Sequence, residues 1–335
     1  MIVNIFGTWA NAAAEHTAFL NAAIDAFLAK IAAKTSDSLS TTETDVHSFI
    51  LAFRNIIAAP DEVDYSAVIH AFDVNFPPGS EKRAAARLHF EEIFDYTNFS
   101  KKDTPGWNAY ELCLKSKAVV CPYCHINSTR TVIASDEGKG YRPQLDHYYG
   151  KATYPILALS LGNLIPCCAT CNGPGFKHLT DFAINPHLHP FQDTENIAFD
   201  LHPTNPPGRD QALIEAMRGR VDEYTLSVHP VSSCTKTKAS MYTFQLKSRY
   251  ENERIQAWYF AREIYRQLRA EKLASDNNLL SVIPSRNAMI EAATGVQLED
   301  AWIAPFDLTS DAEYKNYRTG KMLRDIYRAA IERWD

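Results

Sequence analysis

The sequence predicts an α+β fold that is mostly helical, with a small metal-stabilised unit in the middle of the chain. In both terminal parts, apolar residues recur at three- and four-residue steps, the pattern of amphipathic helices. Over residues 119–177 the composition shifts to Cys, Gly, Pro and aromatic residues. So short a segment cannot bury a large core and needs another source of stability. We therefore expect three regions, 1–110, 111–200 and 201–335, of which the first and last are mainly helical.

The N-terminal region is predicted to contain three helices, over residues 9–34, 44–59 and 81–96. In the first, Leu20, Ile24, Phe27 and Ile31 fall on one helical face. Pro60 limits the second, and the break Pro77-Pro78-Gly79 precedes the third. We find no cluster of catalytic residue types in this acidic region.

The C-terminal part is predicted to begin irregularly and to end in helices. Residues 183–209 are rich in Pro, His and Asn and are expected to form an irregular connection. Alternating apolar residues predict a strand pair within 223–231. Helical periodicity predicts one long helix over 246–273 and a last helix from Asp311, where Ser310 and Glu313 form a capping-box pair.

The charge of the chain limits the classes of partner without excluding nucleic acids. With 34 basic and 40 acidic side chains the formal net charge is −6, which is not typical of a dedicated nucleic-acid coat protein. Residues 101–182, however, carry nine basic and six acidic side chains, and screening over about 8–10 Å lets such a local excess act on its own. The N-terminus lacks a secretory signal, and no apolar run approaches the roughly 20 residues of a membrane span. We expect a cytoplasmic protein with no membrane contact.

Cysteine spacing is the first specific signal. Five of the seven cysteines lie within residues 121–171, and in a cytoplasmic chain such clustering favours metal or catalytic use over disulfides. The pairs Cys121/Cys124 and Cys168/Cys171 are CxxC knuckles, whose spacing lets two thiolates bind one tetrahedral Zn²⁺. Four thiolates leave no open position, so this zinc would be structural. A redox CxxC, or Cys167 or His125 as a replacement ligand, is the weaker alternative.

The segment between the knuckles contains residue types suited to metal-assisted phosphodiester cleavage. Cys124 and Cys168 are separated by 43 residues, far more than the roughly 15–20 of a simple zinc ribbon. This insert carries an adjacent carboxylate and imidazole and one carboxamide, and a second carboxamide and an ammonium follow the second knuckle. These groups are Asp146, His147, Asn163, Asn172 and Lys177.

At these residues the chain resembles the HNH endonucleases, the ββα-metal nucleases, in the branch with Asn at the third position and paired CxxC zinc motifs. The resemblance covers residues 121–177 and is carried by Leu145-Asp146-His147, Tyr154-Pro155, Asn163-Leu164-Ile165-Pro166 and Cys168-Ala-Thr-Cys171-Asn172. It is closest to HNH proteins of bacterial anti-phage systems, including Septu and some retrons. It implies a central zinc-stabilised ββα-metal unit flanked by helical regions, and an effector of anti-phage defence that hydrolyses phosphodiester bonds in DNA.

The resemblance also implies roles for individual residues. His147 would be the general base, which suits an imidazole with an unperturbed pKa of about 6.5. Asp146 and Asn172 would hold a catalytic Mg²⁺ or Mn²⁺, with His147 at the same ion site, and Asn163 would orient His147. Three basic side chains flank the site and would contact phosphates: Arg142, Lys151 and Lys177.

Two other hypotheses stay open at this stage. In one, the chain is a catalytically idle, zinc-stabilised nucleic-acid-binding or scaffold module. In the other, it is a toxin-like nuclease restrained or activated by an ATPase or another defence-system partner. RNA remains an alternative substrate to DNA, and a homodimer is one way for a single-strand cutter to make double-strand breaks.

Overall fold

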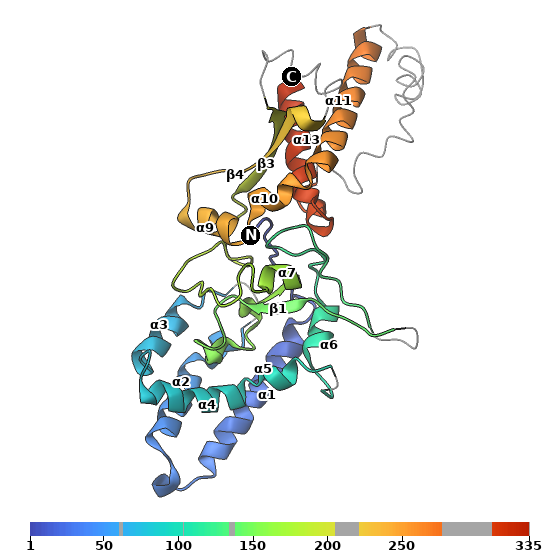
Figure 1. Cartoon of the computed structure of the whole chain (residues 1–335). Helices are drawn as coiled ribbons and strands as arrows, with labels where there is room; N and C mark the ends of the chain where they lie inside the picture. The colour runs from blue at the N-terminus through green and yellow to red at the C-terminus, as the bar shows by residue number, and fades with distance from the viewer. Residues whose placement is uncertain (60–62, 103, 134–137, 205–220, 277–309, 335) are drawn as a thin grey trace. The chain divides into compact units, whose positions relative to one another are not determined.

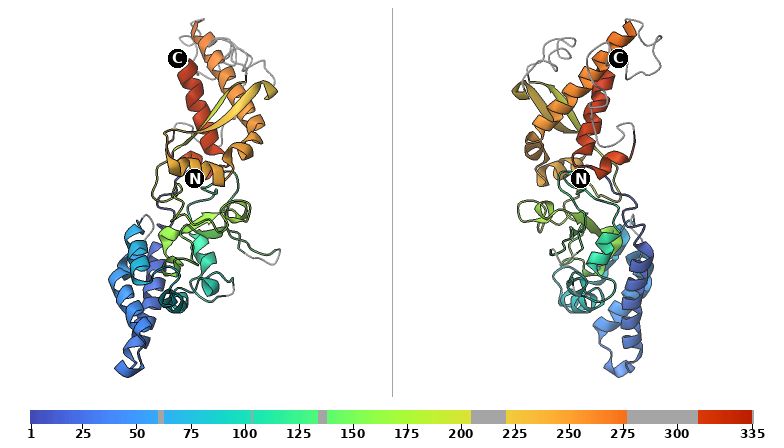
Figure 2. Two further views of the ribbon diagram at one scale, coloured as in Figure 1. Left: turned by 60° about the vertical axis from the view of Figure 1, so that its left-hand side comes forward. Right: turned by 90° about the vertical axis from the view of Figure 1, so that its right-hand side faces the viewer.

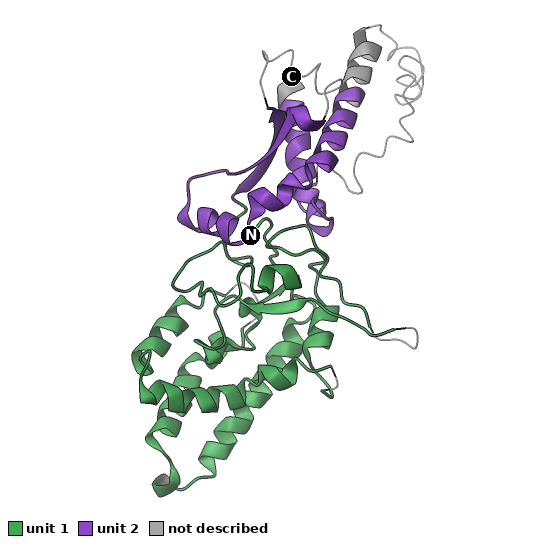
Figure 3. Cartoon of the chain, viewed as in Figure 1, with its two compact units in different colours: residues 1–195 green, residues 196–335 purple. Residues whose placement is uncertain are grey.

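The chain combines helices with two small sheets and divides into two compact units. The computed structural model describes residues 1–59, 63–102, 104–133, 138–204, 221–276 and 310–334. Within these residues α-helices are accompanied by two antiparallel sheets of two strands each (Figure 1), which confirms the expected mixture of helix and strand. The units are Met1–Glu195 and Asn196–Asp335 (Figure 3). No described helix combines the length and the apolar character that crossing a bilayer would require.

The first unit opens with a group of helices. They are α1 (Ala13–Ala32), α2 (Thr41–Ile57), α3 (Ser66–Asn75), α4 (Glu81–Ile93), α5 (Tyr96–Phe99) and α6 (Ala109–Leu114). The three expected helices correspond to α1, α2 and α4, whereas α3, α5 and α6 were not predicted. The expected third helix was too long because Asp95 begins a new turn: its carboxylate accepts a hydrogen bond from Asn98 N at 2.9 Å, and α5 follows.

Aromatic packing joins α2, α3 and α4, and α2 and α4 lie side by side (Figure 1). Phe49, Phe72, Phe76 and Phe90 form a buried cluster in which every pair of ring centroids is 5.3–5.9 Å apart. Each buried ring contributes roughly 1.5–3 kcal/mol through removal of apolar surface from water. The helices therefore form a core of their own and can serve as a rigid support.

A strand pair and a one-turn helix follow. Strand β1 (Gln144–His147) pairs antiparallel with β2 (Leu164–Cys167), so that Asp146 lies opposite Ile165. The connection between the strands contains two 3₁₀ turns, η2 (Pro155–Leu157) and η3 (Leu161–Asn163), and β2 leads into α7 (Ala169–Asn172). The candidate residues at positions 146, 147, 163 and 172 thus all lie on this short arrangement.

The N-terminal segment and α1 contact strand β2 and the loop that connects β1 to β2. The indole Nε1 of Trp9 donates to the carbonyl of Leu164 in β2 at 3.1 Å, and His16 Nε2 lies 2.6 Å from the carbonyl of Leu159. Both side chains are fully buried. Residues 1–110, for which the sequence suggested no function, therefore support the strands that carry the candidate site.

The buried His16 is expected to make stability depend on pH. Its Nδ1 accepts a hydrogen bond from Trp107 Nε1 at 2.9 Å, so the neutral ring is fully paired, and burial lowers its pKa from 6.5 to about 4. Between about pH 6.5 and pH 4, His16 is protonated in the unfolded chain but stays neutral in the folded chain. The free energy of unfolding should therefore fall by about 3 kcal/mol as the pH drops from 6.5 to about 4, and this contribution should be fully present above pH 6.5. Urea unfolding across this range should show a shallower pH slope for His16→Gln than for wild type. Identical slopes would contradict the assignment.

In the second unit a β-hairpin lies beside two long helices (Figure 2). Strands β3 (Ile197–Pro203) and β4 (Tyr224–Pro230) pair antiparallel, and the first, third and fifth residues of each are buried. The 3₁₀ turn η4 (Val221–Glu223) precedes β4. Among the described residues, the helical elements after β4 are α9 (Thr235–Thr243), α10 (Leu246–Glu251), α11 (Arg254–Asp276), the 3₁₀ turn η6 (Glu313–Asn316) and α13 (Gly320–Trp334).

Four expectations for this part were wrong. The strand pair expected within 223–231 is the single strand β4, whose partner is β3. β3 lies in the supposedly irregular 183–209 segment, where Ile197, Phe199 and Leu201 alternate with polar residues within a Pro- and His-rich context. The expected helix over 246–273 is divided into α10 and α11. The last helix begins at Gly320 and not at Asp311, because the chain turns back tightly there: a Cβ at position 320 would lie 2.1 Å from the carbonyl oxygen of Tyr314.

Candidate functional site

Four cysteines gather in the first unit and can hold a metal ion such as zinc. The sulfur atoms of Cys121, Cys124, Cys168 and Cys171 all lie within 4.8 Å of one another, and all four residues are buried. Around a zinc ion with bonds of about 2.3 Å, tetrahedral sulfurs would be about 3.8 Å apart, close to the 4.0 Å between Cys124 and Cys168. Burial raises the pKa of the Cys121 thiol well above its usual range, so a bound cation is needed to keep such a thiol ionised. These are the four predicted ligands, and Cys167 lies on β2 outside the cluster.

N–H groups donate hydrogen bonds to two of the four cysteine sulfurs. Cys124 Sγ accepts from Ile126 N at 3.5 Å, and Cys168 Sγ accepts from Cys171 N and from Asn127 Nδ2, both at 3.4 Å. Such N–H···S contacts stabilise thiolates and orient them toward a metal. The donor set and its surroundings therefore both suit Zn²⁺.

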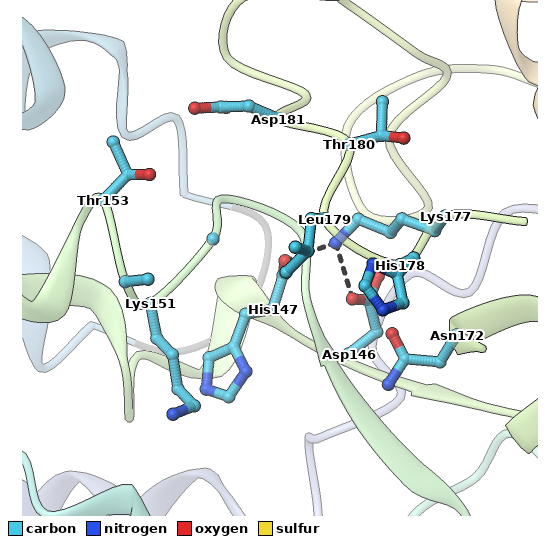
Figure 4. Close-up of a pocket in the computed structure, with 12 residues that line it drawn as sticks. Asp146, His147, Lys151, Thr153, Asn172, Lys177, His178, Leu179, Thr180 and Asp181 are labelled. Carbon is cyan, nitrogen blue, oxygen red and sulfur yellow. Dashed lines mark hydrogen bonds and ion pairs between the residues drawn. The ribbon is translucent and has the colours of Figure 1, made fainter. Parts of the chain in front are cut away.

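Asp146 is buried and has a partner on each oxygen (Figure 4). Lys177 Nζ lies 2.5 Å from Oδ1, and the Tyr123 hydroxyl, which belongs to the first knuckle, donates to Oδ2 at 2.6 Å. Lys177 also donates to the carbonyl of His147 at 2.5 Å. Burial, together with the Asp146 charge, holds the pKa of Tyr123 well above its usual range, so the phenol stays a donor. One knuckle of the cysteine cluster thus directly contacts the carboxylate.

The His147 imidazole is oriented with one nitrogen available. Its Nε2 lies 2.9 Å from the carbonyl of Ala158, and because a carbonyl only accepts, Nε2 carries the proton and Nδ1 keeps a lone pair. The Tyr96 ring meets the imidazole nearly at right angles, with centroids 4.4 Å apart. Burial lowers the pKa of His147 from 6.5 to about 4, so the ring is neutral near pH 7 and Nδ1 can accept a proton.

Asn163 stabilises the loop between β1 and β2 through side-chain hydrogen bonds to the backbone of that loop. Its Oδ1 accepts from Tyr149 N at 2.7 Å, and its Nδ2 donates to the carbonyls of Tyr149 and Leu157 at 3.0 and 2.9 Å. The side chain is completely buried and does not line the pocket described next. Its contacts fix the backbone that immediately follows His147.

An open pocket of about 480 Å³ brings several predicted residues together. Asn172, at the end of α7, donates from Nδ2 to Gln144 Oε1 at 2.8 Å, and in Figure 4 its carboxamide oxygen lies on the side of Asp146. A carboxylate, an imidazole and a carboxamide therefore line the same pocket. The described residues that line the pocket are Asp146, His147, Gly150, Lys151, Ala152, Thr153, Asn172, Lys177, His178, Leu179, Thr180 and Asp181.

The three predicted phosphate-contacting side chains lie in different environments. The guanidinium of Arg142 donates to the carbonyl of Ser100 at 3.1 Å, and Arg142 does not line the pocket. Lys177 is only 3% exposed and faces Asp146. Lys151 lines the pocket, and the described part of the chain provides no ion pair for it. Of the three, Lys151 is placed best to meet a ligand.

Sequence analysis missed two parts of this site. Tyr123 was treated only as a residue between two metal ligands, although its position inside the knuckle places it beside Asp146. The other part is the wall formed by residues 179–181, which follow shortly after Lys177 in the chain. No local pattern marks these residues, since their proximity to the pocket results from the turn after α7.

Asp146 and Asn172 carry oxygen atoms of the kind that Mg²⁺ and Mn²⁺ bind, whereas His147 offers a nitrogen. In the structure both oxygens of Asp146 have protein partners, with Lys177 as the cation.

No protein-family model matches the chain, and no match to it was found among curated proteins or solved structures. A function for the protein has therefore to be inferred from the pocket and the cysteine cluster themselves.

Proposed function

We propose that this protein is a divalent-metal-dependent endonuclease of the HNH type that hydrolyses phosphodiester bonds in DNA. The observation that carries the proposal is that Asp146, His147 and Asn172 all line one open pocket. The strand pair bearing the first two ends at a buried four-cysteine cluster suited to structural zinc. The order of these residues along the chain, and their resemblance to HNH nucleases, further support it.

In this proposal His147 is the general base. Its Nδ1 takes a proton from water, the water oxygen bonds to phosphorus, and the bond from phosphorus to the 3′ oxygen breaks as that oxygen leaves and is protonated by solvent. Asp146 and Asn172 would hold Mg²⁺ or Mn²⁺, which when bound stabilises negative charge on the phosphate and the leaving oxygen. Lys151 would contact a phosphate from the pocket wall.

The proposed biological role is that of an effector in bacterial anti-phage defence. The resemblance to Septu and retron-associated HNH proteins supports this role, and it implies an ATPase or another defence-system partner as the activator. A single pocket of this kind cuts one strand, so a homodimer would be needed for concerted double-strand breaks. Toxicity on expression in bacteria that His147→Ala relieves would support the role.

Cleavage of plasmid DNA tests the proposed activity. Wild-type protein with Mg²⁺ or Mn²⁺ should nick supercoiled plasmid, and His147→Ala should lower the rate by about 10²–10⁴, the usual contribution of a general base. His229→Ala, which removes an exposed histidine of β4 in the second unit, should cut at the wild-type rate. Equal cleavage by wild type and His147→Ala, or none with either metal and any activating partner, would contradict the proposal.

One observation favours a second candidate function, an idle zinc-stabilised module that binds nucleic acid or acts as a scaffold. Both oxygens of Asp146 already have partners, Lys177 and Tyr123, as expected of a structural carboxylate. Nucleic-acid binding that is independent of Mg²⁺ and Mn²⁺, without any cleavage, would favour this module.

A further inference from the structure

Lys177 places a positive charge next to the carboxylate that the proposed metal site requires. Its ammonium bridges Asp146 Oδ1 and the carbonyl oxygen of His147, at 2.5 Å from each. The two side chains are only 3% and 4% exposed. The ammonium thus holds two hard oxygen atoms on the wall of the pocket, as a metal ion at this position would.

A divalent cation bound to Asp146 would lie beside the Lys177 ammonium. Each oxygen of Asp146 already has one partner, Lys177 on Oδ1 at 2.5 Å and the Tyr123 hydroxyl on Oδ2 at 2.6 Å. A magnesium ion would bind either oxygen at about 2.0–2.1 Å, so the ammonium and the metal ion would be neighbours on one carboxylate. Two positive charges so close in a buried setting repel strongly, since little solvent screens them.

We propose that Lys177 is a built-in competing cation, which must leave Asp146 before Mg²⁺ or Mn²⁺ can bind. This inference rests on the proposed function, because it concerns the regulation of the same pocket. Lys177 itself lines the open pocket of about 480 Å³, which gives its side chain room to move away from Asp146. The resting pocket holds its own cation, and metal loading is an exchange.

Binding of Mn²⁺ to the zinc-loaded full chain tests the exchange. By calorimetry or by the electron paramagnetic resonance of free Mn²⁺, Lys177→Met should bind Mn²⁺ at least about tenfold more tightly than wild type, the scale of a neighbouring-charge effect. The double variant Lys177→Met/Asp146→Asn should lose that gain. Wild type and Lys177→Met binding Mn²⁺ equally tightly would overturn the proposal.

A second measurement uses the wild-type chain and does not depend on how the variants fold. Reductive methylation followed by mass spectrometry should leave Lys177 unmodified without Mn²⁺ and modify it at saturating Mn²⁺. Lys151, on the same pocket, serves as the internal control and should react in both conditions. A Lys177 that stays protected when Mn²⁺ saturates the Asp146-dependent site would overturn the exchange.

Neither readout uses cleavage, so the two proposals fail separately. A chain that exchanges Lys177 for Mn²⁺ without cutting DNA would support the exchange and refute the nuclease. A chain that cuts DNA while wild type and Lys177→Met bind Mn²⁺ equally would overturn the exchange alone.

Discussion

Loss of the metal from the four-cysteine cluster is expected to disorder the pocket as well as the knuckles. The Tyr123 side chain extends from the first knuckle to Asp146, and β2 runs directly into Cys168. Binding of a structural zinc contributes about 10–16 kcal/mol in small zinc peptides, as much as the whole net stability of a typical domain. Cys168→Ser should therefore lose zinc and lower the melting temperature by more than about 10 °C.

Zinc content and thermal melting of the purified protein would check this expectation. The matched control is Cys167→Ala, which removes the neighbouring buried cysteine outside the cluster. It should retain one zinc per chain, with a smaller loss of stability from the lost packing. If Cys168→Ser keeps its zinc and melts with the wild type, the cluster does not stabilise the pocket.

The cysteine cluster could be predicted because its signal is local. Each CxxC spacing brings its own two sulfurs to one side of a turn, so only the meeting of the two turns depended on the fold. Asp146 and His147 could be named as candidate site residues for a similar reason, since they are adjacent in sequence and lie on one short strand. Their surroundings were not predictable in the same way.

The partners of Asp146 depend on contacts between distant parts of the chain. Tyr123 and Lys177 lie 23 and 31 residues from it in sequence, and no periodicity links such positions. Lys177 was predicted to contact phosphates, which requires an accessible ammonium, yet the turn after α7 buries it against a carboxylate. The candidate residues of the pocket could be named from the sequence, whereas the partners of Asp146 could not.

The same limit explains the errors in the second unit. The alternation in β3 is clear only once β4 is known as its partner, because the surrounding Pro and His residues indicate an irregular segment. Helical periodicity continues through residues 252 and 253, so it did not reveal the division between α10 and α11. The pair Ser310 and Glu313 does start a turn, since Ser310 Oγ accepts from Glu313 N at 3.2 Å. That turn leads into η6, and the helix begins only at Gly320, where the chain folds back.

Replacing Asn163 is expected to have a large effect on stability even though no reacting atom is removed. Its carboxamide satisfies the Tyr149 amide and two carbonyl groups in a fully buried position. Asn163→Asp keeps the size of the side chain but replaces the Nδ2 donor by a carboxylate oxygen facing the carbonyls of Tyr149 and Leu157. An unpaired buried charge of this kind costs about 3–5 kcal/mol, whereas Asn163→Ala, which leaves the same backbone groups without a partner, should cost about 2–4 kcal/mol.

The order of stability near neutral pH is therefore expected to be wild type, then Asn163→Ala, then Asn163→Asp, as measured by urea unfolding. Burial would raise the pKa of the introduced carboxyl above its unfolded value of about 3.9. The variant's deficit relative to wild type should therefore shrink as the pH falls through that raised pKa, because the protonated carboxyl regains a donor. The deficit of Asn163→Ala should stay constant with pH. An Asn163→Asp protein as stable as wild type near neutral pH would show that these hydrogen bonds do not brace the loop behind His147.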